Sequence, residues 1–172
     1  LVFGPATEAP DVADSVLYDG QVADRAAQSL AELSHEPDEP FFLAVGFVKP
    51  HSPYIAPKKY WDLYDPAKIK ITGQTDFPAD APRIALHGSG ELRRYTDQAK
   101  SGPITDEKQR RVKHAYYACI SYIDAQIGKV LAALEKQGLK DNTVVVLWGD
   151  HGYHLGELSR CAAGWRGVGA GG

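Results

Sequence analysis

The sequence has no methionine and only two cysteines among its 172 residues. Cys119 and Cys161 are too few and too far apart for a disulfide framework or a cysteine-based zinc site. A formal net charge of −3 lacks the excess of positive charge typical of nucleic-acid-binding proteins, so we expect no nucleic-acid partner. No apolar run reaches the ~20 residues of a membrane-spanning helix, so we expect no membrane span.

The N-terminal residues 1–5 lack both an initiator methionine and the charged, then apolar, layout of a signal peptide. We therefore expect the chain to be an internal piece of a longer protein. With 44% hydrophobic and 24% charged residues, the composition is that of a globular domain with enough length for one sizeable core.

Two helix-then-strand units are predicted from the apolar pattern. Apolar residues at steps of three and four predict one helix that starts at Asp19 and ends before Pro37, and a second that starts after Thr105 and ends at Gly138. Continuous apolar runs follow at 41–48 and 143–148, as in strands covered on both faces of a parallel sheet. This order predicts an α/β domain with a mainly parallel sheet flanked by helices.

Histidines follow both predicted strands. The first strand leads into Lys49-Pro50-His51, and the second into Gly149-Asp150-His151-Gly152-Tyr153-His154. Ligands of open α/β sheets bind beyond the carboxyl ends of the strands. A carboxylate and an imidazole are metal ligands, and flanking glycines let the backbone bend tightly around an ion. The two strand exits therefore predict one shared site.

The residues by themselves leave other interpretations open. A lone histidine after a strand, such as His51, is more often a hydrogen-bonded structural or turn residue. The pair Asp150-His151 is equally compatible with a turn that caps the next helix. Cys119 falls on the apolar stripe of the second helix, which predicts an inert thiol in the core.

Four segments occur in an order and with a spacing that resemble the sulfatase family of the alkaline phosphatase superfamily, on its iduronate-2-sulfatase-like branch. The segments are 41–51, 56–64, 116–126 and 145–157. The resemblance implies a partial chain of the large sulfatase N-terminal domain, hydrolysis of sulfate esters, and sulfated uronic acids or related sugars of polysaccharides as substrates. It also implies a periplasmic, secreted or lysosomal location.

The resemblance further implies the cofactors of the site. In such sulfatases a cysteine in the signature Cys-x-Pro-Ser-Arg becomes formylglycine, and a divalent cation, usually calcium, holds a sulfate oxygen. Neither cysteine of this chain stands in that signature. We therefore expect the formylglycine and the remaining metal ligands in an upstream part.

The resemblance assigns roles to three residues, and a fourth lies next to them in the sequence. Asp150 and His151 match metal-site residues, and His51 matches a histidine that binds the sulfate and helps to protonate the leaving oxygen. His154 lies close enough in sequence to line the same substrate pocket. Calcium prefers oxygen ligands, so His151 is an unusual calcium ligand.

The resemblance ends at Glu157. We therefore divide the chain into residues 1–157, a partial sulfatase α/β catalytic domain, and residues 158–172, a glycine-rich tail unrelated to the family. Two other functions stay open: a metal-dependent phosphodiesterase or phosphonate hydrolase of the same superfamily, and a non-catalytic anion- or sugar-binding remnant.

Overall fold

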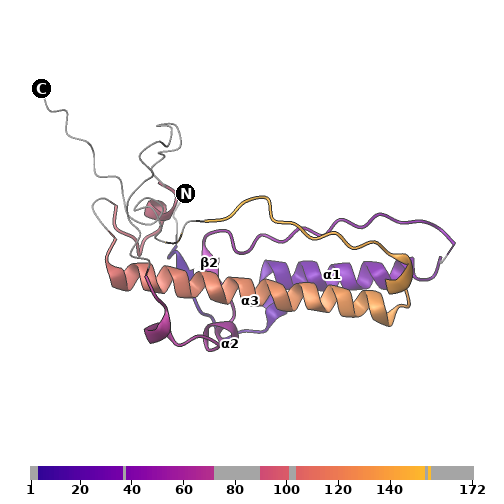
Figure 1. Cartoon of the computed structure of the whole chain (residues 1–172), viewed down its shortest axis with the longest axis horizontal. Coiled ribbons are helices and arrows are strands. Elements are labelled where there is room, and N and C mark those ends of the chain that lie inside the picture. Colours follow the sequence, from indigo (N-terminus) through magenta and orange to yellow (C-terminus); the bar gives the residue numbers. More distant parts are fainter. Residues whose placement is uncertain (1–3, 37, 72–89, 101–103, 154, 156–172) are drawn as a thin grey trace, which may run out of the picture.

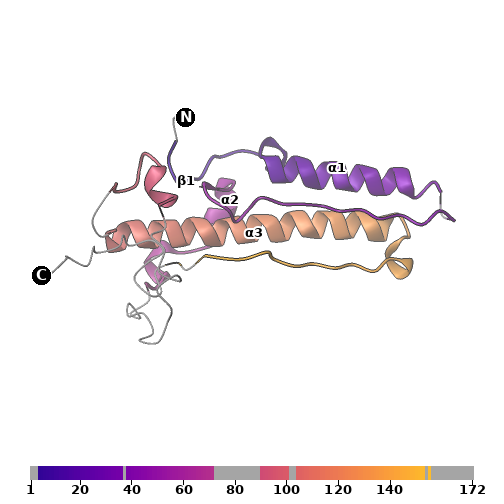
Figure 2. The ribbon, with the colours of Figure 1, turned by 90° about the horizontal axis from the view of Figure 1, so that it is seen from above.

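A computed structural model describes residues 4–36, 38–71, 90–100, 104–153 and 155. Two long helices, α1 (Tyr18–Leu33) and α3 (Asp106–Lys136), lie side by side along the long axis of this part of the chain (Figures 1 and 2). The short helix α2 (Lys58–Trp61) lies against α3, and strands β1 (Thr7–Glu8) and β2 (Tyr54–Ile55) pair in parallel with Thr7 opposite Tyr54. Single 3-10 turns occupy Asp14–Val16, Pro66–Lys68, Leu92–Arg94 and Lys140–Asn142.

Both predicted long helices are confirmed. Helix α3 begins where Thr105 accepts a hydrogen bond from the amide of Lys108 at 3.4 Å, and acidic residues in its first turn oppose the positive end of the helix dipole. It ends just before Gly138, whose φ of 70° stops the helix in the left-handed region that favours glycine. Local sequence signals therefore set both ends of this helix.

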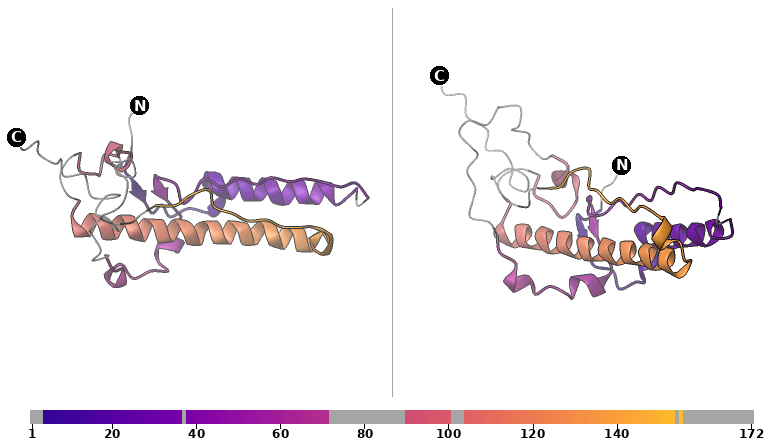
Figure 3. Two further views of the ribbon diagram at one scale, coloured as in Figure 1. Left: turned by 45° about the horizontal axis from the view of Figure 1, so that its top comes forward. Right: turned by 45° about the vertical axis from the view of Figure 1, so that its right-hand side comes forward.

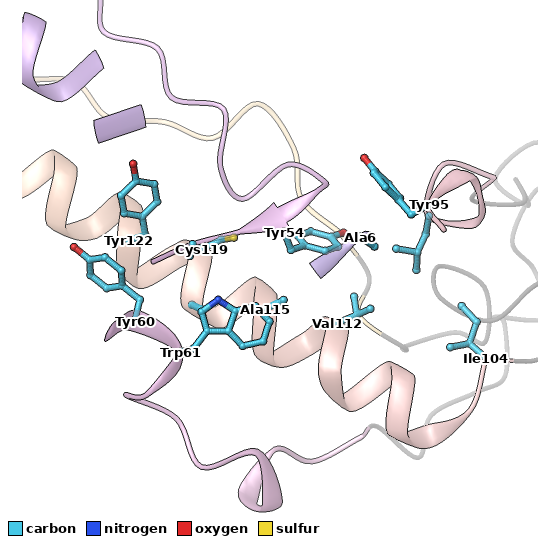
Figure 4. Close-up of a cluster of buried hydrophobic side chains, with 13 residues drawn as sticks. Ala6, Tyr54, Tyr60, Trp61, Tyr95, Ile104, Val112, Ala115, Cys119 and Tyr122 are labelled. Carbon is cyan, nitrogen blue, oxygen red and sulfur yellow. The ribbon is translucent and has the colours of Figure 1, made fainter. Parts of the chain in front are cut away.

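The core lies where α3 meets α2 and the β1–β2 pair. Ala115, Cys119 and Tyr122 of α3 are fully buried there, with Tyr60 and Trp61 of α2 against them (Figure 4). Burial raises the pKa of the Cys119 thiol to about 12, which confirms the expected inert core thiol.

Segments 41–48 and 143–148 are extended, as predicted, but they are not buried strands. Neither has the ladder hydrogen bonds of a strand, and Phe42 and Trp148 are 93% and 77% exposed. Along 41–48 half-buried and exposed residues alternate, so one face is partly covered and the other is open. The prediction of burial on both faces was wrong because, in the described part of the chain, β1 and β2 pair only with each other and no strand flanks either segment.

The two units of helix and extended segment nevertheless run parallel to each other, as in an α/β fold. Helices α1 and α3 run the same way, and each is followed by an extended segment that returns along one side of the helix pair (Figures 1 and 3). Both returning segments therefore lead back toward β2. This is the geometry that brings the two histidine-bearing exits together.

Candidate active site

His51 lies in the turn that follows segment 41–48. Its Nδ1 donates a hydrogen bond of 2.7 Å to the carbonyl oxygen of Ser52, so in the neutral ring Nε2 is the nitrogen without a proton. Nε2 faces Glu91 Oε1 at 3.7 Å, a contact that becomes an ion pair when the ring is protonated. The side chain is 47% exposed, so the imidazole is held on one side and open to solvent on the other.

Glu91 is a site residue that the sequence did not indicate. It accepts a hydrogen bond of 2.7 Å from the hydroxyl of Ser52, so a single carboxylate oxygen contacts both Ser52 and His51. Glu91 comes from the connection between the two helix-and-segment units, forty residues after His51, where no periodicity or motif marks it. Only the tertiary structure brings it to the turn.

Tyr153 links the two predicted parts of the site. Its ring lies edge-on to His51 at 6.0 Å and to His151 at 5.9 Å between ring centroids. Burial raises the pKa of its hydroxyl above the ordinary value, and interactions with Ser52 act against that shift. The turns after the two extended segments therefore meet around one aromatic ring.

Tyr153 stands inside the recognised motif, but it received no role from the sequence. The rings of Tyr54 and Tyr116 lie edge-on to it, at 5.9 and 6.3 Å between centroids. Tyr54 is buried in the core, so Tyr153 couples the turn that carries His151 to the packed part of the molecule. The missing signal is long-range packing, which no local pattern reports.

Asp150 and His151 contact each other, and both side chains are largely exposed to solvent. The backbone amide of His151 donates to Asp150 Oδ1 at 2.9 Å, and the side chain of Asp150 is 86% exposed. Nδ1 of His151 donates to the carbonyl of Gly152 at 3.2 Å, which leaves Nε2 as the nitrogen available to a ligand.

The separation between these two side chains suits a pair of ligands to one ion. Asp150 Oδ2 and His151 Nε2 lie 3.9 Å apart, within reach of one cation because metal–ligand bonds measure about 2.0–2.6 Å. Within the described ranges no group of three or more His, Cys, Asp or Glu side chains could hold a metal. Asp150 and His151 therefore fit part of a ligand set. The fourth predicted residue, His154, lies outside the described residues.

Residues 7–169 match the family model of the sulfatases, and this chain belongs to the sulfatase family. The match extends into residues 158–172, which lie outside the described part, and the boundary at Glu157 stays a prediction. No helix among the described residues is long and apolar enough to cross a membrane.

Three relatives illustrate the range of the family. The chain is 35% identical to iduronate 2-sulfatase of Homo sapiens over 153 residues, which cover 86% of this chain and 28% of that protein. It is 33% identical to choline-sulfatase of Rhizobium meliloti over 86% of this chain and 29% of that protein. Identity to arylsulfatase of Clostridium perfringens is 36%, over 71% and 24% respectively. The chain thus spans less than a third of the length of these relatives.

Proposed function

We propose that this chain forms part of the catalytic domain of a sulfatase, an enzyme that hydrolyses sulfate esters. One observation carries the proposal: His51 and His151 come from distant parts of the sequence and both contact the ring of Tyr153. Family membership supports the reaction class, because the relatives are named as sulfatases.

In this proposal His51 donates a proton to the leaving oxygen. Its Nδ1 is engaged with the carbonyl of Ser52, so Nε2 is the nitrogen that exchanges the proton. Glu91 Oε1 lies 3.7 Å from Nε2 and forms an ion pair with the ring when the ring carries this proton. Nearly half of the side chain is open to solvent, which leaves room for a sulfate ester.

Asp150 and His151 are proposed to hold a divalent cation, with calcium favoured by the carboxylate oxygens. A bound cation would stabilise the negative charge of the transferring sulfate group. The exposed Oδ2 of Asp150 and the free Nε2 of His151 are the atoms that would bind it. His154 is proposed to line the same pocket, and formylglycine is expected from a part of the protein upstream of this chain.

The proposed substrate class is a sulfated uronic acid or a related sugar, as a small molecule or within a polysaccharide. The similarity to iduronate 2-sulfatase over 86% of the chain supports this class. A periplasmic, secreted or lysosomal location belongs to the same proposal.

The test is a kinetic assay of the complete sulfatase that contains this chain, with a sulfated uronic acid, an aryl sulfate and an aryl phosphodiester as parallel substrates. We expect the sulfate esters to be hydrolysed and His51→Gln to lower kcat by about 10²–10⁴-fold, the usual contribution of a positioned acid. His114→Gln is the matched control, because His114 instead bonds to the carbonyl of Trp61 at 2.9 Å. Faster hydrolysis of the phosphodiester would favour a phosphodiesterase. Binding of sulfate without turnover of any substrate would favour an anion-binding remnant.

A further inference from the structure

Asp19 is a buried carboxylate that the site described above does not use. It lies in the first turn of α1 and is 2% exposed. Its two oxygens accept hydrogen bonds from consecutive backbone amides, Oδ1 from Val48 at 2.8 Å and Oδ2 from Lys49 at 3.1 Å. Such bonds to an ionised acceptor are stronger than those between neutral groups. Asp19 therefore fixes the backbone where segment 41–48 enters the turn of His51.

The side chain of Lys49 holds the same turn from its other end. Its Nζ donates to the carbonyl of His51 at 3.1 Å and to the carbonyl of Pro53 at 2.7 Å. Burial lowers the pKa of Lys49 from its ordinary value, and the negative charge of Asp19 acts against that shift. The ammonium group of Lys49 thus bonds to two carbonyls within residues 49–53, the turn that contains His51.

Asp19 is itself held in place by helix α3. The amide of the adjacent Gly20 donates to the hydroxyl of Tyr122 at 2.6 Å, and Tyr122 is fully buried. A Cβ at Gly20 would overlap the carbonyl of Asp14, so this close approach requires glycine. The position of Asp19 is therefore set by the packing of α1 against α3.

We infer that Asp19 and Lys49 are positioning residues for His51. They join the packed α1–α3 pair to the backbone of the turn that presents the imidazole to Glu91 and Tyr153. The role of His51 as a proton donor belongs to the proposed function, on which this inference rests. The hydrogen bonds that position it can be tested without any measurement of activity.

The test uses the complete sulfatase that contains this chain and two readouts by mass spectrometry: hydrogen exchange of a peptide with Val48 and Lys49, and carbethoxylation of His51 by diethyl pyrocarbonate. For Asp19→Asn we expect exchange at these amides to rise at least about 10-fold and modification of His51 about 3-fold, because one charged acceptor is lost. His114 is the internal control, since a general loss of structure would raise its modification as well. Asp24→Asn is the matched variant, because Asp24 lies on the same helix and forms an exposed ion pair with Lys129 at 2.8 Å. It should change neither readout.

Lys49→Met tests the other end of the turn and keeps the experiment decisive if Asp19→Asn does not fold. This variant should raise the modification of His51 about 3-fold and leave hydrogen exchange of the α1 and α3 peptides unchanged. Lys49→Arg should restore the slower rate of modification, because its guanidinium can donate to the same carbonyls. Modification of His51 at the wild-type rate in Lys49→Met would overturn the inference. The same holds if Asp19→Asn folds and speeds amide exchange without any change at His51. A failure of the sulfatase assay would leave both readouts unaffected, so the two proposals fail separately.

Discussion

The carboxylate of Asp14 receives hydrogen bonds from the Tyr60 hydroxyl at 2.7 Å and from Gln126 Nε2 at 3.0 Å. Lys59 Nζ forms an ion pair with it at 2.7 Å. Burial acts to raise the pKa of Asp14, but the bonds from Lys59, Tyr60 and Gln126 outweigh it, and the pKa lies below its ordinary value of 3.8. Single side chains of this kind tie α2 and α3 to the turn before α1.

The depressed pKa of Asp14 determines how its contribution to the free energy of unfolding changes with pH. Because the folded-state pKa is depressed, the contribution of Asp14 is present above pH 3.8 and is lost as the pH falls through the lower folded value. We expect Asp14→Asn to reduce the free energy of unfolding by about 1–3 kcal/mol at pH 7, with the difference from wild type shrinking below pH 3.8. Urea unfolding of the complete sulfatase that contains this chain, followed by circular dichroism at several pH values, measures it. An equal loss at pH 7 and at pH 3 would contradict the linkage, and Asp24→Asn is the exposed control.

Cys119 provides a second test at the scale of one residue. At pH 8 a thiol with a pKa of about 12 is ionised to only ~10⁻⁴, so its reaction with iodoacetamide should be at least about 1,000-fold slower in the folded chain than in urea. Labelling of the complete sulfatase, measured by mass spectrometry of the peptide that contains Cys119, reports this thiol alone. Rapid native labelling would show that the core between α3 and β2 opens readily.

At the scale of elements, the predictions succeeded where the signals are local. The apolar steps, the Thr105 cap and Gly138 specify α3 without reference to any other part of the chain. The extended backbone of 41–48 was also predictable, because its β-branched and aromatic residues favour it. The exposure of this segment was not predictable, because the burial of an extended segment depends on the strands beside it.

The site follows the same rule. The motifs placed His51 and His151 at the exits of the two returning segments, and both exits lead to the ring of Tyr153. The sequence did not indicate Glu91 or Asp19, because their contacts with the turn span 39 residues from Ser52 and 29 residues from Val48. Neither contact has a periodic or motif signal, and each depends on how the helices pack.

Two glycines in the long helices provide a matched pair for the packing of α1 on α3. Gly20→Ala should lower the free energy of unfolding by about 1–3 kcal/mol, since the new Cβ overlaps the backbone of Asp14 and forces the chain to shift. Gly128→Ala should raise it by about 0.5–1 kcal/mol, because Gly128 is an exposed helix position with nothing within 4 Å of an added Cβ. Urea unfolding of both variants in the complete sulfatase checks the pair. Equal effects of the two substitutions would mean that α1 does not approach the Asp14 turn as closely as the structure shows.

At the scale of the whole molecule, the exposed apolar residues concentrate on the two returning segments. They include Phe42 and the run from Val144 to Trp148, and their backbones lack ladder partners in the described ranges. Extended segments with unpaired backbone groups and apolar side chains are templates for association with other strands. The same surface would be covered if further strands of a sulfatase domain packed there.

These properties predict how the isolated 172-residue chain behaves. It should hydrolyse no aryl sulfate, because neither of its cysteines stands in the formylglycine signature, and it should self-associate and melt without a sharp cooperative transition.

The variant Val144→Lys/Val146→Lys adds charge at two exposed positions and should reduce association, measured by light scattering, with little loss of helix signal. In the complete sulfatase the same pair should instead impair folding, because lysines would then enter a covered sheet. The two settings therefore give opposite expectations for one variant. A monomeric wild-type chain with a sharp melt, or one that hydrolyses an aryl sulfate, would contradict the expectation that further strands cover these segments in the complete sulfatase.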